Sequence, residues 1–119
     1  MRWLQIFLIE PYLTGEAFDK YFGGVADLEL HLLVKNRSAE VKQYAETHMQ
    51  QYKTNIEVRK SKEIHDRLII VDRGDVWTVG GSLNQKGDKA TLLAPLTPGV
   101  AQSAIDLYSD LWDQANPVS

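Results

Sequence analysis

Short apolar runs alternate along the chain with longer amphipathic segments. Runs too short for a capped helix and rich in β-favouring residues predict strands. They cover residues 3–9, 28–34, 56–59, 68–71, 76–79 and 91–94. The run at 68–71 is apolar throughout, so we expect a central strand buried on both faces. Residues 72–75 have turn composition, which predicts a hairpin that returns through residues 76–79.

Three segments carry apolar residues at helical spacing. Thr14 can cap the first helix and Ser38 the second, which we expect over about residues 38–52. The third begins at Pro98 and ends near Pro117. The order is strand–helix–strand–helix–strand, then a hairpin, a strand and a helix. It predicts an α/β or α+β sheet with packed helices, and 119 residues suit one domain, 1–119.

The composition, 44% hydrophobic and 24% charged, is that of an ordinary globular protein. The chain has no cysteine, which excludes a disulfide framework, a thiol nucleophile and a thiolate zinc site. It also fits a reducing compartment, so we expect a cytoplasmic protein. No apolar run approaches the ~20 residues of a membrane helix. The first residues lack a small-residue cleavage site, so we interpret them as a strand and not as a signal peptide.

The net charge of −3 does not favour a nucleic-acid or anionic-membrane partner, but its distribution is uneven. Residues 53–89 hold eight Lys/Arg and six Asp/Glu, whereas residues 90–119 hold no Lys/Arg and three Asp. The middle segment is therefore net +2. This excess is either chance or a local anion site, in which Arg59, Lys60 and Lys62 could follow a phosphate backbone.

Of the three histidines, His31 and His48 fall within a predicted strand and on the apolar face of a predicted helix. Structural roles are expected for both. His65 lies where a polar segment enters the most apolar strand, and strand ends are common places for reactive groups in α/β sheets. If Arg67 continues that strand, the two side chains share one face roughly 6–7 Å apart. That separation suits two groups contacting one phosphate, but on spacing alone a charged strand edge and a glycine turn with ordinary polar residues is the favoured interpretation.

At these residues the sequence resembles the phospholipase D superfamily, whose signature is H-x-K-x-x-x-x-D followed by G-S-x-N. The corresponding segments here are His65-Asp66-Arg67-Leu68-Ile69-Ile70-Val71-Asp72 and Gly81-Ser82-Leu83-Asn84. The segment Ile9-Glu10-Pro11-Tyr12-Leu13 also resembles the strand-to-turn segment found early in these domains. The resemblance implies an α/β fold, a phospholipase D-like mixed sheet flanked by helices.

The resemblance further implies phosphodiester chemistry without a metal or other cofactor. His65 would attack phosphorus to form a phosphohistidine, and a histidine from a second motif would act as acid and then as base. Arg67 would clamp the phosphate oxygens, Gly81, Ser82 and Asn84 would bind phosphate, and Asp72 would support the motif from behind. Since this chain has one motif, the resemblance implies a homodimer with paired His65 residues.

Two departures from the signature put catalysis in question more than the fold. Arg67 replaces the lysine, and arginine binds phosphate well but is bulkier and planar. Lys86 or Lys89 could supply a compact cation if their loop folds back; otherwise they are solvated loop lysines. The eight residues from 73 to 80 also form a longer gap than usual. The chain is short for a free-standing member, so it could work beside, or within, a larger protein.

The sequence leaves three functions open. The first is a dimeric, nuclease-like phosphodiesterase; a phospholipid substrate is less favoured because no basic amphipathic helix is present. The second is a catalytically degenerate module that binds phosphate-bearing ligands or mediates assembly. The third, a metal enzyme using His65, Asp66 and Asp72, is disfavoured because neighbouring strand residues face opposite ways.

Overall fold

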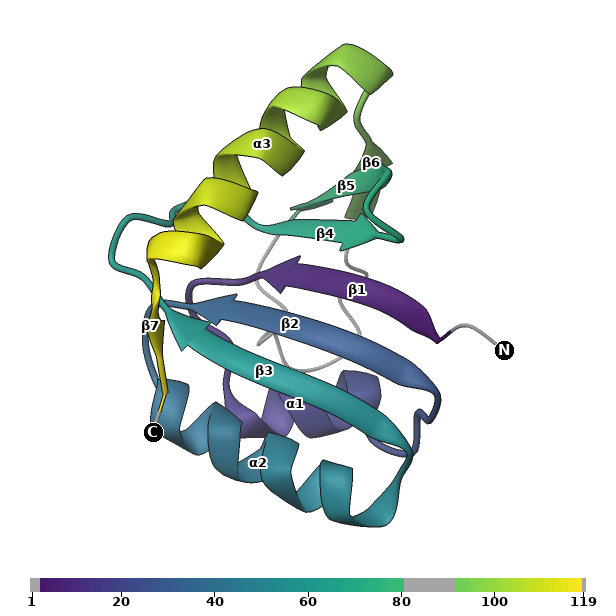
Figure 1. Ribbon diagram of the computed structural model, residues 1–119, viewed down its shortest axis with the longest axis vertical. Coiled ribbons are helices and arrows are strands. Elements are labelled where there is room, and N and C mark those ends of the chain that lie inside the picture. Colours follow the sequence, from purple (N-terminus) through teal and green to yellow (C-terminus); the bar gives the residue numbers. More distant parts are fainter. Residues whose placement is uncertain (1–2, 81–91, 119) are drawn as a thin grey trace.

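The computed structural model describes residues 3–80 and 92–118, which form one mixed sheet of seven strands with three helices (Figure 1). The strands are β1 (Leu4–Ile9), β2 (Leu28–Val34), β3 (Thr54–Lys60), β4 (Leu68–Val71), β5 (Asp75–Gly80), β6 (Leu92–Pro95) and β7 (Asn116–Pro117). The helices are α1 (Gly15–Phe22), α2 (Ser38–Gln51) and α3 (Pro98–Gln114). The predicted elements are confirmed, apart from the two-residue edge strand β7, for which the sequence pattern is too short.

The strand order in the sheet is β6-β5-β4-β1-β2-β3-β7. β1, β2 and β3 are parallel and are joined through α1 and α2, as parallel strands require a crossover connection. β4 runs antiparallel to β1, and β5 returns beside it as the predicted hairpin. The carboxyl ends of β1, β2 and β3 therefore meet the beginning of β4 at one edge of the sheet. We call this edge the carboxyl edge.

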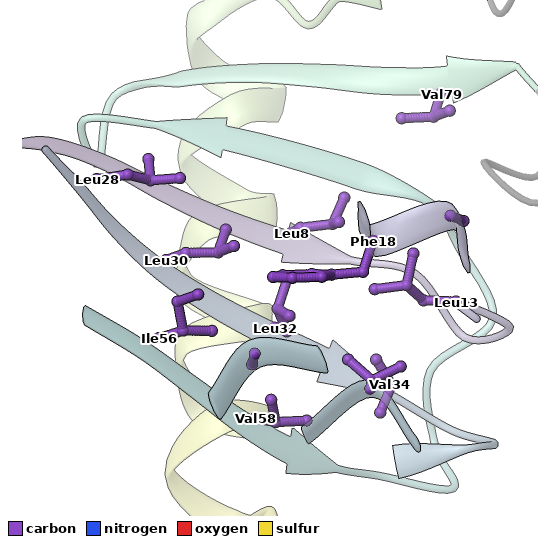
Figure 2. Packing of buried hydrophobic residues seen from close by; sticks show 13 residues of the cluster. Leu8, Leu13, Phe18, Leu28, Leu30, Leu32, Val34, Ile56, Val58 and Val79 are labelled. Atoms are coloured by element: carbon purple, nitrogen blue, oxygen red, sulfur yellow. The ribbon is translucent and has the colours of Figure 1, made fainter. Parts of the chain in front are cut away.

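Residues of β1, β2, β4 and β5 are divided between two hydrophobic clusters, one on each face of the sheet. The first cluster packs the sheet against α1 and α2 around Phe18, which is 1% exposed (Figure 2). The second packs the other face against α3 through Tyr108 and Trp112. Each large apolar side chain buried in this way contributes roughly 1.5–3 kcal/mol to the free energy of unfolding. A shift of one residue in any core strand would exchange the two faces, so the clusters fix the register.

Two expectations about the elements are wrong in detail. Ser38 does not cap α2, because Arg37 occupies the boundary in a left-handed conformation (φ 56°) and Ser38 is already helical. β4 is not buried on both faces, since Ile69 and Val71 are half-buried. The reason is that α1 and α2 pack beside β1, β2 and β3 and leave the β4 part of that face less covered (Figure 1).

The first crossover is held by close contacts that the sequence encodes. Thr14 caps α1 as predicted, with Oγ1 accepting the N–H of Ala17 at 3.1 Å. Gly15 lies beneath the ring of Tyr44 on α2, where a Cβ atom would lie 2.3 Å from ring carbons. A larger residue at position 15 would therefore force the Tyr44 ring to move, so the glycine allows this close contact between α1 and α2. This approach fixes the chain that leaves the end of β1, where the candidate site begins.

Candidate functional site at the carboxyl edge

The segment from Ile64 to Arg67 is not part of β4, which begins at Leu68. Strand alternation therefore does not place His65 and Arg67 on one face, and other contacts hold the two residues. Ile64 is 1% exposed within the cluster under α3. The carbonyl of Arg67 accepts the N–H of Val79 at 3.0 Å. His65 is exposed on a segment fixed at both ends.

His65 and Arg67 line one cleft of about 550 Å³ between this segment, β5 and the first half of α3. Val100 and Leu107 of α3 form part of its far wall, with exposures of 56% and 54%. The volume lies in the range of small-molecule sites. The structure thus brings the predicted nucleophile and the predicted clamp to the same cleft.

The guanidinium of Arg67 faces a buried carboxylate that our sequence analysis did not assign to the site. Nε of Arg67 lies 3.4 Å from Oε1 of Glu10, whose side chain is 0% exposed, whereas that of Arg67 is 29% exposed. The β1–β4 register ends with the pair Ile9 and Leu68, and Glu10 and Arg67 are the residues that directly adjoin this pair. A carboxylate placed directly after an apolar strand was the signal in the sequence.

The surroundings of this pair fix its orientation. Oε2 of Glu10 accepts the N–H of Tyr12 at 3.3 Å. The Arg67 guanidinium carbon lies 5.9 Å from the centroid of the Tyr12 ring, within range of a cation–π interaction. Nε of Arg67 is buried and makes no hydrogen bond to the described residues. The contact with Glu10 is therefore an ion pair that offsets part of the positive charge available to an anion.

Asp66 and Tyr108 connect the motif to α3. The Tyr108 hydroxyl donates to Oδ2 of Asp66 at 3.0 Å. Burial raises the pKa of Tyr108 to about 12, and the hydrogen bond and negative charge of Asp66 act in the same direction. The hydroxyl remains a donor at neutral pH. The sequence identified Tyr108 only as a residue of the apolar helix face, because its partner is 42 positions away.

Asp72 lies at the opposite end of β4 from His65. Its backbone N–H donates to the Gln5 carbonyl at 2.8 Å, and its Oδ1 accepts the Gln5 N–H at 3.1 Å. The residue has a φ of 50° and stabilises the β4–β5 turn against the start of β1. These contacts act on the placement of β4 beside β1.

The remaining predicted phosphate-binding residues lie outside the described part of the chain: Gly81, Ser82, Asn84, Lys86 and Lys89. Their assignment stays a prediction.

Arg59 is engaged in structural contacts and does not follow the expectation for the basic segment. Its Nε lies 2.6 Å from Glu57, its Nη1 donates to the Trp112 carbonyl at 2.7 Å, and its guanidinium lies over the Trp112 ring. These contacts connect β3 to the end of α3. Lys60 and Lys62 remain exposed beside it.

The other two histidines make contacts within the fold, and a structural role for each stays a prediction. His48 is 5% exposed, and its ring nitrogens lie 3.1 Å from Thr54 Oγ1 and 2.9 Å from the Phe22 carbonyl. His31 stacks on Trp112 with ring centroids 4.6 Å apart. Burial lowers the pKa of His31 below 6.5, although nearby Glu57 and Glu29 oppose this effect.

The metal-enzyme interpretation is wrong in its proposed ligand set. Asp66 is hydrogen-bonded to Tyr108, and Asp72 lies at the far end of β4 from His65. Within residues 3–80 and 92–118, no three His, Asp or Glu side chains are grouped to hold a metal. Over the same residues, no helix is long and apolar enough to cross a membrane.

Comparisons with known proteins bear on the fold. No protein-family model matches the sequence, and no curated protein matches it significantly. Solved structures do match. One is Nuc, a phospholipase D family member from Salmonella typhimurium, with a TM-score of 0.61 and 18% identity over 96% of this chain and 81% of that chain.

A second match is TrmBL2, an archaeal chromatin protein described as showing a novel mode of DNA binding. Its TM-score is 0.55 at 12% identity, and the match covers 96% of this chain and 44% of that chain. At such low identity the likeness extends to the fold alone. The chain has the phospholipase D-like α/β fold, a mixed sheet flanked by helices, as the resemblance predicted.

Proposed function

We propose that the protein is a metal-independent phosphodiesterase of the phospholipase D type, nuclease-like in its substrate, in which His65 is the nucleophile. The observation that carries the proposal is the exposed His65 imidazole in a cleft that also contains Arg67. Histidine suits nucleophilic and acid–base roles near neutral pH. The likeness to the Nuc fold supports the same chemistry.

The proposed reaction has two steps, transfer of the phosphoryl group to His65 and its release by water. A ring nitrogen of His65 forms a bond to phosphorus as the bond to the leaving oxygen breaks, and a second imidazole gives that oxygen a proton. Water then attacks phosphorus, the phosphorus–nitrogen bond breaks, and the second imidazole takes the proton from water. Arg67 stabilises the negative charge on the non-bridging oxygens in both steps.

The second imidazole is His65 of another copy of the chain. A two-fold axis beside the cleft would place the two imidazoles on opposite sides of one phosphate. A homodimer is therefore part of the proposal. Sedimentation equilibrium at micromolar concentration tests it, and a monomer throughout would contradict a competent site.

The ion pair between Arg67 and Glu10 favours a second candidate function, a phosphate-binding module without turnover. The buried carboxylate offsets charge that the clamp would otherwise direct at phosphate. Such a module could serve assembly within a larger protein or beside other domains. Phosphate binding would then persist while the two chemical steps are lost.

One experiment distinguishes these candidates. The protein is incubated in EDTA with single- and double-stranded DNA, RNA and a bis-nitrophenyl phosphate ester. His65→Ala is compared with Val100→Ala, a change on the cleft wall outside the chemistry. We expect turnover in EDTA that His65→Ala abolishes and Val100→Ala retains, with a covalent phosphoryl adduct detected by intact mass.

Binding without turnover would identify the module instead. Arg67→Lys then shows whether the arginine is the disabling change, because the compact ammonium matches the family signature. A gain of turnover in Arg67→Lys would assign the loss to Arg67. Activity that survives His65→Ala would refute both the nucleophile and the mechanism.

A further inference from the structure

A hollow lined by lysines also lies at the carboxyl edge, apart from the cleft that contains His65. Lys35 follows the end of β2, Lys60 ends β3, and Lys62 follows it. These lysines line a hollow of about 470 Å³ together with Ser61 and the end of α3. Gln114 and Asn116 add amide groups to the wall. Ammonium, hydroxyl and amide groups can all donate hydrogen bonds to an anion.

The three lysines have no ion-pair partner among the described residues. Other cationic side chains in the same part of the chain do form ion pairs: Lys42 pairs with Glu46 at 3.6 Å, and Arg59 pairs with Glu57. Glu63 is the acidic residue that lines the hollow, which leaves a net charge of +2. This local excess occurs in a chain of net charge −3.

The alternative explanation is that the lysines stabilise α3. The last turn of α3 contains no basic residue, so cations nearby would compensate its negative end. That role predicts a loss of thermal stability when the lysines are removed, and it predicts no effect on a ligand. Removing the lysines would therefore change only thermal stability if they serve α3, whereas it would weaken ligand binding if they form an anion site.

The register gives the separation between the hollow and the catalytic cleft. Leu68, Ile9, Leu33 and Arg59 form one paired row across β4, β1, β2 and β3, and Arg67 and Lys60 adjoin the two ends of this row. Three strand spacings separate Arg67 from Lys60, about 14 Å. One phosphate cannot contact both. A nucleic-acid strand carries a charge about every 3.4 Å of duplex axis, so several phosphates fit this span.

We propose that Lys35, Lys60 and Lys62 form a backbone subsite for a nucleic-acid strand, whose reacting phosphodiester lies in the cleft with His65. This inference rests on the proposed function for its catalytic part. A strand that crosses the ends of β1, β2 and β3 contacts both sites at once. A small phosphodiester reaches the cleft alone.

The test compares Lys60→Ala/Lys62→Ala with Lys20→Ala/Lys53→Ala, which removes the same charge away from the hollow. Lys53 lies just before β3, at the opposite end of that strand. Binding of a labelled 20-nucleotide single strand is measured by fluorescence anisotropy across salt concentrations. We expect the first variant to lose about tenfold in affinity, and its salt slope to fall by about 1.4, for two phosphate contacts. The control should retain most of its affinity.

Turnover separates failure of the subsite from failure of the proposed function. Lysine removal should slow cleavage of the oligonucleotide and leave bis-nitrophenyl phosphate cleavage unchanged, whereas His65→Ala should abolish both and retain binding. If the wild-type protein turns over neither substrate, the proposed function fails and the binding data alone decide the subsite.

Equal affinity of the two lysine variants would overturn the subsite. A lower melting temperature without loss of affinity would also overturn it, because the lysines would then serve α3. Lys60→Arg/Lys62→Arg retains charge and should restore binding. Lysine-dependent binding to phosphatidylglycerol vesicles without binding to the oligonucleotide would reject a nucleic-acid ligand.

Discussion

Replacing Glu10 with Gln tests the buried ion pair at the carboxyl edge. Glutamine retains the shape of the side chain and an oxygen to accept the Tyr12 N–H, but removes the negative charge that faces Arg67. The half-buried guanidinium then lacks its counter-ion. We expect the variant to be less stable than the wild-type protein and to bind anions more tightly, since Arg67 is no longer offset.

The magnitude follows from the burial of the two partners. Removing one member of a fully buried pair costs about 3–5 kcal/mol. Because the Arg67 side chain is 29% exposed, water compensates part of that loss, and we expect about 2–3 kcal/mol for Glu10→Gln. At the usual unfolding entropy per residue, this lowers the melting temperature by about 8–12 °C. Arg67→Met should cost more, since it removes the counter-ion of a carboxylate that is fully buried, whereas Glu10→Gln removes that of a guanidinium that is partly exposed.

A double-mutant cycle isolates the pair. Urea unfolding of the wild type, Glu10→Gln, Arg67→Met and the double variant should give a coupling energy of at least about 1.5 kcal/mol. Glu46→Gln is the matched control, because it breaks the exposed pair with Lys42 and should cost less than about 0.5 kcal/mol. A coupling energy below about 0.5 kcal/mol would show that the carboxylate does not hold the clamp.

Three further predictions concern α3 and the β4–β5 turn. Absorbance at 295 nm should show that Tyr108 ionises near pH 12. Because folding raises this pKa, the contribution of Tyr108 to the free energy of unfolding is lost between about pH 10 and 12, and Tyr108→Phe should flatten that decline. NMR titration should give His31 a pKa below 6.5. Because folding lowers this pKa, the free energy of unfolding should fall as the pH drops below 6.5, and the same dependence on pH in His31→Gln would exclude His31 as its source. Arg73 has a φ of 61°, a left-handed conformation that strains residues other than glycine. In urea titrations Arg73→Gly should therefore raise the free energy of unfolding by up to about 1 kcal/mol, and an unchanged or lower value would contradict the strain.

The helices, the strands and the class of the fold could be predicted from the order of residues. Apolar residues that recur every second position indicate strands, and those that recur about every 3.6 positions indicate helices, because each element must bury one face. Thr14 and the turn at 72–75 could be identified because caps and turns depend on neighbouring residues. His65 and Arg67 were assigned to one site through the spacing of a motif.

The contacts that hold the motif, and the residues that complete it, depend on how distant segments pack together. Glu10 and Tyr108 lie 57 and 42 positions in sequence from Arg67 and Asp66, and only strand pairing and helix docking bring them together. The hollow formed by the lysines likewise requires β2, β3 and α3 to end at one edge. Local propensity acts over a few residues. Contacts between distant segments depend on the register of the sheet and on which face each helix covers.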